Sequence, residues 1–151
     1  MAASQLEGLL GSAKDIDTKT GAVTYHGAID TTVTVDVENN KYSASFSSGG
    51  SVSSTTRAGL AAAIETYALL NPEDFAQKEG GTNAANGETK SSFTITLKNG
   101  ITANVEAEVV EGEWKITNIT GKDNNDLDPA DQEQIYSAAE KAFTKTLDVS
   151  G

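Results

Sequence analysis

The stretch FTITLKNGITANVEAEVVEGEWKITNI (93–119) decides the fold of this chain. Apolar and polar residues alternate along it in three runs, which Asn99-Gly100 and Glu111-Gly112 separate. Alternation with a period of two is typical of β-strands that bury one face, and Asn-Gly is a strong signal for a two-residue hairpin turn. The stretch therefore predicts three consecutive antiparallel strands.

An earlier part of the chain carries a similar pattern. Residues 22–49 align without a gap on residues 94–121, and this alignment places Tyr42 on Trp114. Any two alternating strands resemble each other when they are aligned at an even offset. The similarity can therefore reflect either a true duplication or two halves that share only their architecture. If the halves are duplicated, the pseudo-repeats span 21–71 and 92–149, and the polar loop 77–92 joins them.

Helical patterns separate and flank these strands. Ser4 and Glu7 have the spacing of a capping box, and a helix start is also expected at Thr55 or Thr56 and at Asp128-Pro129. The sequence therefore predicts an α+β fold of one domain, 1–151, in the order helix-βββ-helix-βββ-helix, with antiparallel sheets and the helices packed on one face. The predicted core comprises Leu6, Leu10, Val33, Val35, Val37, Tyr42, Phe46, Leu60, Ile64, Ile95, Leu97, Val105, Val109, Trp114, Ile116, Ile135, Ala139 and Phe143.

Composition excludes several classes of function. With 22 acidic and 11 basic residues the net charge is −11, which disfavours nucleic acid as a partner. The chain has no cysteine, and its single histidine excludes paired-histidine metal sites. No apolar run is long enough to cross a bilayer, and the first residues lack the pattern of a signal peptide. We expect no membrane partner and a cytoplasmic or virion location, which is unknown if a signal peptide has been removed.

No group of polar residues satisfies the spacing that chemistry requires. Asp15-Ile16-Asp17 lacks the context of a phosphotransferase motif, and the acidic turn 123–128 has the wrong register for a calcium loop, although an irregular cation site there stays open. We interpret Glu106, Glu108, Glu111 and Glu113 as solvent-exposed edge protection and His26 as a surface residue. From the sequence we therefore expect a protein that is not an enzyme and that binds neither a cofactor nor a metal ion.

Two resemblances suggest other roles. The run Val105–Thr120, an alternating strand followed by Gly-x-Trp-Lys-Ile, resembles the closing hairpin of cystatin-like and NTF2-like domains, which implies a small-ligand pocket beneath Trp114. The order of the elements and the acidic composition resemble type III secretion chaperones, which implies a cytosolic dimer that presents a groove to another polypeptide.

The physical pattern itself favours association. An acidic surface, free strand edges and a short leucine-bearing helix suit a structural or scaffold-type subunit, such as a virion or assembly component. We expect its partner to be a second copy of the chain or another protein, and its contact residues to be Leu6, Leu9 and Leu10. The chaperone or adaptor and the pocket domain are the alternatives.

Overall fold

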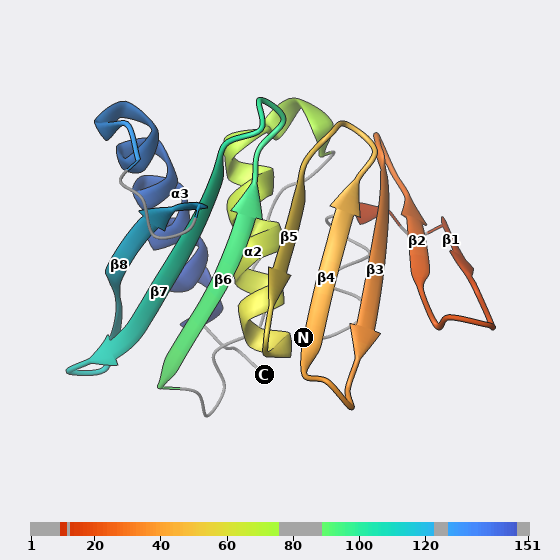
Figure 1. The fold of residues 1–151 in the computed structure, drawn as a ribbon, viewed down its shortest axis with the longest axis horizontal. Helices are drawn as coiled ribbons and strands as arrows, with labels where there is room; N and C mark the ends of the chain where they lie inside the picture. The colour runs from red at the N-terminus through yellow and green to blue at the C-terminus, as the bar shows by residue number, and fades with distance from the viewer. Residues whose placement is uncertain (1–9, 12, 76–88, 123–126, 148–151) are drawn as a thin grey trace.

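One open antiparallel sheet organises the chain. The computed structural model describes residues 10–11, 13–75, 89–122 and 127–147, and Figure 1 shows the sheet with two helices behind it. The sheet has eight strands in the order β1-β2-β3-β4-β5-β6-β7-β8, so each strand pairs with its neighbours in the sequence. The predicted α+β class with antiparallel pairing is confirmed.

The strands are more numerous than the sequence predicts. Their bounds are β1 Ala13–Ile16, β2 Val23–His26, β3 Asp30–Asp36, β4 Lys41–Phe46, β5 Ser51–Ser54, β6 Lys90–Thr96, β7 Thr102–Val110 and β8 Glu113–Gly121. Within the described residues five strands precede α2, and the helix-βββ-helix-βββ-helix order is not confirmed. The predicted N-terminal helix that starts at Ser4 lies almost wholly outside those residues. The additional strands, β1 and β5, each contain one large apolar residue, Ile16 and Val52, so neither shows the apolar alternation that identifies a strand.

The second and third predicted helices begin where the sequence predicts. They are α2 (Arg57–Leu70), a 3-10 turn η1 (Pro72–Asp74) and α3 (Pro129–Leu147). The Thr56 hydroxyl accepts a hydrogen bond from the Gly59 N–H at 2.9 Å, and the Asp128 carboxylate accepts one from the Ala130 N–H at 3.0 Å. These side chains satisfy N–H groups that have no partner within the first turn of a helix.

One of the two predicted tight turns differs in length. Glu111 and Gly112 form a two-residue turn with positive φ angles of 53° and 81°. The turn at Asn99-Gly100 has three residues instead, because the Leu97 N–H donates to the Ile101 carbonyl at 2.8 Å. Gly100, with φ at 90°, supplies the left-handed position that a three-residue hairpin requires.

The strand registers do not confirm an internal duplication. In the first unit Val35 pairs with Tyr42. The alignment of the two halves would then place Ala107 opposite Trp114, but Ala107 pairs with Ile116. This shift of two residues gives the two hairpins different lengths. Tyr42 is also half-buried, whereas Trp114 is buried beneath α3.

Aromatic side chains join both helices to the same face of the sheet. Tyr67 of α2 stacks on Phe46 with ring centroids 3.9 Å apart, and Phe143 of α3 contacts Trp114 at 5.1 Å and Phe93 at 6.0 Å. α2 contacts β4, β5 and β6, whereas α3 contacts β8 and α2. The core thus lies between the helices and one face of the sheet, and it extends from Tyr25 and Val33 to Trp114.

The predicted burial of two core residues is wrong. Val35 and Val37 are 39% and 64% exposed, because neither helix extends over the end of β3. Leu6 lies outside the described residues. Tyr42, Leu97, Val109 and Ile116 are partly buried, and the other predicted core residues are buried.

Helix α2 approaches the sheet closely where β5 meets β6. A Cβ atom at Gly59 would lie 2.6 Å from the Ser92 carbonyl oxygen and would also collide with the Ser54 hydroxyl. That hydroxyl donates to the Ser92 carbonyl at 2.7 Å and accepts from the Thr56 N–H at 3.2 Å. Glycine is therefore required at position 59 for packing, even though it weakens a helix by about 1 kcal/mol relative to alanine.

Gly59→Ala is expected to destabilise the protein by about 1–3 kcal/mol, the usual cost of overpacking a tight contact. Urea denaturation of the variant and of the parent protein measures this difference. Helix propensity alone predicts the opposite sign, so an unchanged or higher free energy of unfolding would contradict the packing argument.

Candidate functional site

Two rows of small polar side chains cross the face of the sheet that the helices leave open. The strand registers place residues with the same facing directly opposite one another from strand to strand. The first row is Thr24, Thr32, Ser45, Ser51, Thr96 and Thr102. The second row is Thr34, Ser43, Ser53, Thr94, Asn104 and Thr120. We call these twelve residues the hydroxyl rows.

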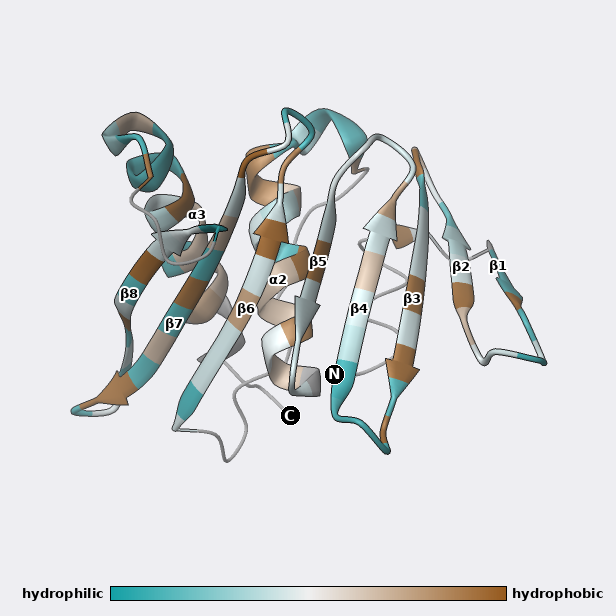
Figure 2. Cartoon of the chain, in the orientation of Figure 1, coloured by the Kyte–Doolittle hydropathy of each residue, from teal (hydrophilic) through white to brown (hydrophobic). Residues whose placement is uncertain are grey.

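The hydroxyl rows carry neither charge nor aromatic rings. Eleven of the twelve residues are serine or threonine and the other is Asn104, in a chain with 22% charged residues. Figure 2 shows the alternation that produces them, with brown apolar residues separated by pale or teal polar ones along β3 and β6. The twelve positions are uncharged, but charged residues lie beside them on the same face, with Asp36 opposite Lys41 and Lys90 opposite Glu108.

Neighbouring side chains in the rows are hydrogen-bonded across the strands. Thr24 and Thr32 share a bond of 3.0 Å, and so do Thr96 and Thr102. The Thr94 hydroxyl donates to the Asn104 side-chain oxygen at 2.7 Å. Cross-strand bonds of this kind stabilise the sheet and orient these side chains.

Shallow hollows follow the rows. One of about 310 Å³ lies over β3–β6 and is lined by Thr34, Ser43 and Ser53 among others. A second of about 860 Å³ extends over β6 and β7 to Thr117. Ser53 and Thr94 line both hollows, so the two adjoin along the second row.

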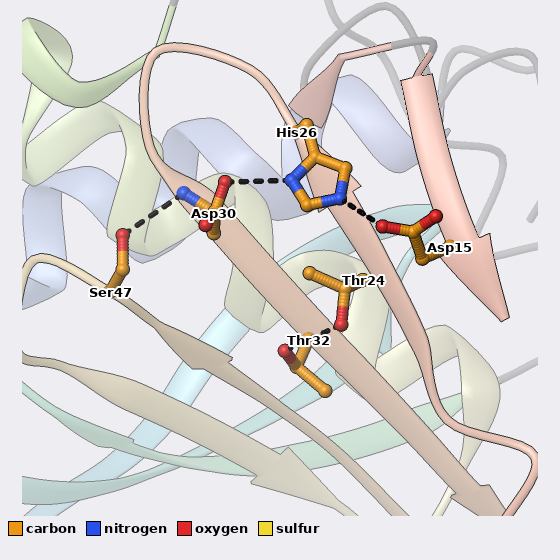
Figure 3. Close-up of polar contacts among 6 residues, drawn as sticks. All are labelled: Asp15, Thr24, His26, Asp30, Thr32 and Ser47. Carbon is orange, nitrogen blue, oxygen red and sulfur yellow. Dashed lines mark hydrogen bonds and ion pairs between the residues drawn. The ribbon is translucent and has the colours of Figure 1, made fainter. Parts of the chain in front are cut away.

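A histidine held by two carboxylates lies beside the rows at the β1 edge. As Figure 3 shows, His26 Nε2 is 2.7 Å from an Asp15 oxygen and Nδ1 is 2.9 Å from an Asp30 oxygen. Asp30 lies directly opposite His26 in β3, its N–H donates to the Ser47 hydroxyl, and Asp15 lies in β1. The edge strand β1 is thereby linked through one imidazole to β3.

This arrangement favours the charged form of His26. An imidazole has two N–H donors only when it is protonated, and both ring nitrogens here face carboxylate oxygens. The hydrogen bonds that His26 donates to Asp30 and, second, to Asp15 raise the pKa of His26 above its ordinary value. Both ring nitrogens are thus occupied by carboxylates. Within the described ranges, no group of three or more His, Cys, Asp or Glu side chains is placed to hold a metal ion.

The stability that His26 contributes is expected to decrease with rising pH. Because its pKa is raised by folding, the contribution is complete below the unfolded value of about 6.5 and is lost as the pH rises through the higher folded value. The NMR shift of its imidazole protons against pH measures this directly, because the chain has one histidine.

Asp15→Asn should lower the pKa of His26 towards its ordinary value, because one carboxylate partner is removed. Asp131→Asn, a substitution in the first turn of α3, is the matched control and should leave the titration unchanged. A parent pKa at or below about 6.5 would contradict the predicted contacts.

The acidic residues singled out in the sequence are not brought together into one site. Glu106 lies on the open face at the end of the rows, where it accepts from the Asn118 amide at 3.4 Å. Glu108 is 3.9 Å from the Lys90 ammonium, and Glu113 is 3.8 Å from that of Lys115. The acidic turn 123–128 lies mostly outside the described residues.

Of the three leucines expected to be contact residues, the structure describes only Leu10. Leu10 is 2% exposed and belongs to the chain's own core, so its side chain offers no free surface to a partner. The adjoining Gly11 has φ at 113°, and a Cβ there would collide with the backbone of His26 and Gly27. Leu6 and Leu9 lie outside the described residues.

Sequence reasoning identified part of the open face and missed the rest. The alternation in β3 and β4 indicates a hydroxylated side there, but Ser51 and Ser53 stand in a stretch rich in Ser, Thr and Gly that gives no strand signal. The pairing of His26 with Asp15 and Asp30 was also missed. A signal was present, because the four-residue spacing of His26 and Asp30 places them opposite each other across a short hairpin.

An apolar patch remains on the helix side of the sheet. Val35 and Val37 follow Val33 at alternate positions, and Ile16 shares their face through the pairings of Ile16 with Val23 and Val23 with Val33. Ile16 is 63% exposed. We call Ile16, Val35 and Val37 the apolar patch.

Both edges of the sheet are blunted. β1 has only four residues, and β8 carries the charged Lys115 and an extra residue opposite Glu106 and Ala107, which disturbs its pairing with β7. Short strands, charges and bulges at sheet edges oppose pairing with another chain. The apolar patch is therefore a better contact surface than either strand edge.

Comparisons with protein families, with curated proteins and with solved structures give no match for this chain. Neither of the described helices has the length and apolar character needed to cross a bilayer.

Proposed function

We propose that this chain is a non-catalytic structural or scaffold-type subunit that acts by self-association. The observation that carries the proposal is the apolar patch, whose three side chains are 39–64% exposed on one face of the sheet. Large apolar side chains grouped on the surface of a protein are typical of interaction sites. A virion or assembly component fits this role.

A second copy of the chain is the partner that we propose for this patch. Two identical patches related by a twofold axis bury each other's apolar surface, which is the usual arrangement in homodimers. The chain's net charge of −11 opposes close approach over much of its surface, but the three residues of the patch are uncharged. Apolar contact is therefore least opposed at this position.

Val35→Asp is expected to convert the assembly into monomers, because it buries a carboxylate in the proposed contact. Val110→Asp is the matched control, since Val110 is 42% exposed in β7, outside the patch, and Val35 is 39% exposed. Light scattering on the eluted peak of a sizing column measures the mass. A monomeric parent protein, or equal effects of the two substitutions, would overturn the proposal.

Removal of residues 1–9 tests the contribution of Leu6 and Leu9. The truncation keeps Leu10, whose loss would damage the core. We expect the truncated protein to self-associate more weakly, with unchanged circular dichroism from the sheet. Sedimentation velocity over a concentration series measures the change, and an unaltered association constant would remove these leucines from the interface.

A chaperone or adaptor is the second candidate. The observation that favours it is a hollow of about 580 Å³ between α2 and α3, lined by Leu69, Leu70, Ala138 and neighbouring polar residues. Grooves between helices accept apolar side chains of another polypeptide. The pocket domain is less well supported, because Phe143 packs against Trp114 at 5.1 Å where that alternative requires a cavity.

A further inference from the structure

We propose that His26 is a pH-dependent latch, which holds the edge strand β1 on the sheet while the imidazole is protonated and releases the strand when the proton is lost. β1 carries Ile16, so its release would also displace one of the three side chains of the apolar patch. That second consequence rests on the proposed self-association, whereas the latch itself does not.

β1 is built to open separately from the rest of the sheet. It has four residues, and within the described part of the chain its main contacts are with β2. Lys14, Asp15 and Ile16 are all exposed, so the strand buries little apolar surface. Segments with few buried apolar contacts open locally at a lower free-energy cost than the core does.

The chain is anchored just before β1. Leu10 is 2% exposed and belongs to the core, and Gly11 lies closely against the backbone of His26 and Gly27. Opening of β1 therefore ends at Gly11 and leaves Leu10 in place. The movement is a local one, which the folded sheet survives.

His26 joins this strand to the interior of the sheet through two short contacts. Figure 3 shows the imidazole between Asp15 of β1, 2.7 Å from Nε2, and Asp30 of β3, 2.9 Å from Nδ1. Both contacts are hydrogen bonds to carboxylates when the ring carries two N–H groups. Protonated His26 therefore connects β1 across β2 to a strand that is paired on both sides.

The charged groups that face His26 come from the two strands beside β2. β1 brings Asp15 and β3 brings Asp30, both on the same face as the imidazole. Lys14 of β1 lies on the other face of the sheet. The loop after β4 adds the uncharged Ser47 hydroxyl near Asp30, and the segment before β1 adds a glycine backbone. Among the described residues, the two aspartates are therefore the titratable partners of His26.

Loss of the proton leaves one of the two contacts unfavourable. A neutral imidazole has a single N–H, so one carboxylate then faces the lone pair of a ring nitrogen. Asp30 belongs to a strand that β2 and β4 hold on both sides, whereas Asp15 belongs to the edge strand and its side chain is 83% exposed. The contact with Asp15 is therefore the one that breaks, and β1 is the strand that moves.

The direction of the switch follows from linkage. The hydrogen bonds to Asp30 and to Asp15 raise the pKa of His26, so the closed strand binds the proton more tightly than the open one does. β1 is therefore held fully below the ordinary histidine pKa of about 6.5 and is released as the pH rises through the higher value of the closed form.

Hydrogen exchange of the backbone amides, followed by NMR on the full chain, tests the latch at about pH 5.5 and about pH 8.5, on either side of the ordinary histidine pKa. Protection factors, from which the pH dependence of chemical exchange is divided out, report the opening of each strand. We expect those of β1 to fall about two- to fivefold at the higher pH, as for the loss of an exposed ion pair, and those of β6 and β7 to stay unchanged. Equal protection of β1 at both pH values, no protection of β1 at either, or an equal fall throughout the sheet would overturn the proposal.

Two substitutions assign the effect to the imidazole and its partner. His26→Gln removes the titrating group, and we expect β1 protection that no longer depends on pH. In Asp15→Asn the side-chain amide can donate to a neutral imidazole, so β1 should stay closed at the higher pH. Asp131→Asn in α3 is the matched control and should behave as the parent protein. A fall as large as that of the parent in either of the first two variants would overturn the assignment to His26.

Sedimentation velocity at the same two pH values tests the consequence for the apolar patch. We expect weaker association of the parent protein at the higher pH and no such change in His26→Gln. A monomer at both pH values would overturn the proposed self-association, whereas unchanged β1 protection would overturn the latch, so the two failures are distinguishable. Unaltered association despite lower β1 protection would remove Ile16 from the contact between copies.

Discussion

The structure depends on the close approach of α2 to the seam between β5 and β6. Only three residue pairs join these strands, although they connect the first five strands to the last three. Gly59 lets α2 lie directly on the seam. The hydroxyl of Ser54, the last residue of β5, donates to the Ser92 carbonyl of β6 and so links the two strands. Gly50 plays the same role for Tyr67, because any side chain there would displace the ring that stacks on Phe46.

This packing divides the protein into surfaces of different character. One side of the sheet is apolar and is covered by α2 and α3 over β4–β6 and β8. The other side carries the hydroxyl rows, with the His26 cluster and charged pairs such as Asp36 with Lys41 and Lys90 with Glu108 beside them. Much of the remaining acidity lies on the turns and on the outer side of α3, where repulsion favours solubility.

The sequence predicted the elements that carry strong periodicity. β3, β4 and β6–β8 alternate over six or more residues, and the ends of α2 and α3 have recognisable caps. β1 and β5 were missed because each has a single large apolar residue and owes its structure to pairing with its neighbours rather than to alternation. The burial of Val35 was mispredicted for a related reason, since alternation identifies a face but cannot say whether a helix covers it. The hydroxyl rows depend on register across eight strands, which a local pattern does not contain.

The strand order has a consequence for how the chain folds. All strand pairs join neighbours in the sequence, so most hairpins form through short loops and can assemble quickly. The seam is different, because β5 ends at Ser54 and β6 begins only at Lys90, with α2 between them. Closing that long connection costs more entropy than closing any of the hairpins. We therefore expect two cooperative folding units, with the seam as the last contact to form and the first to open under mechanical load.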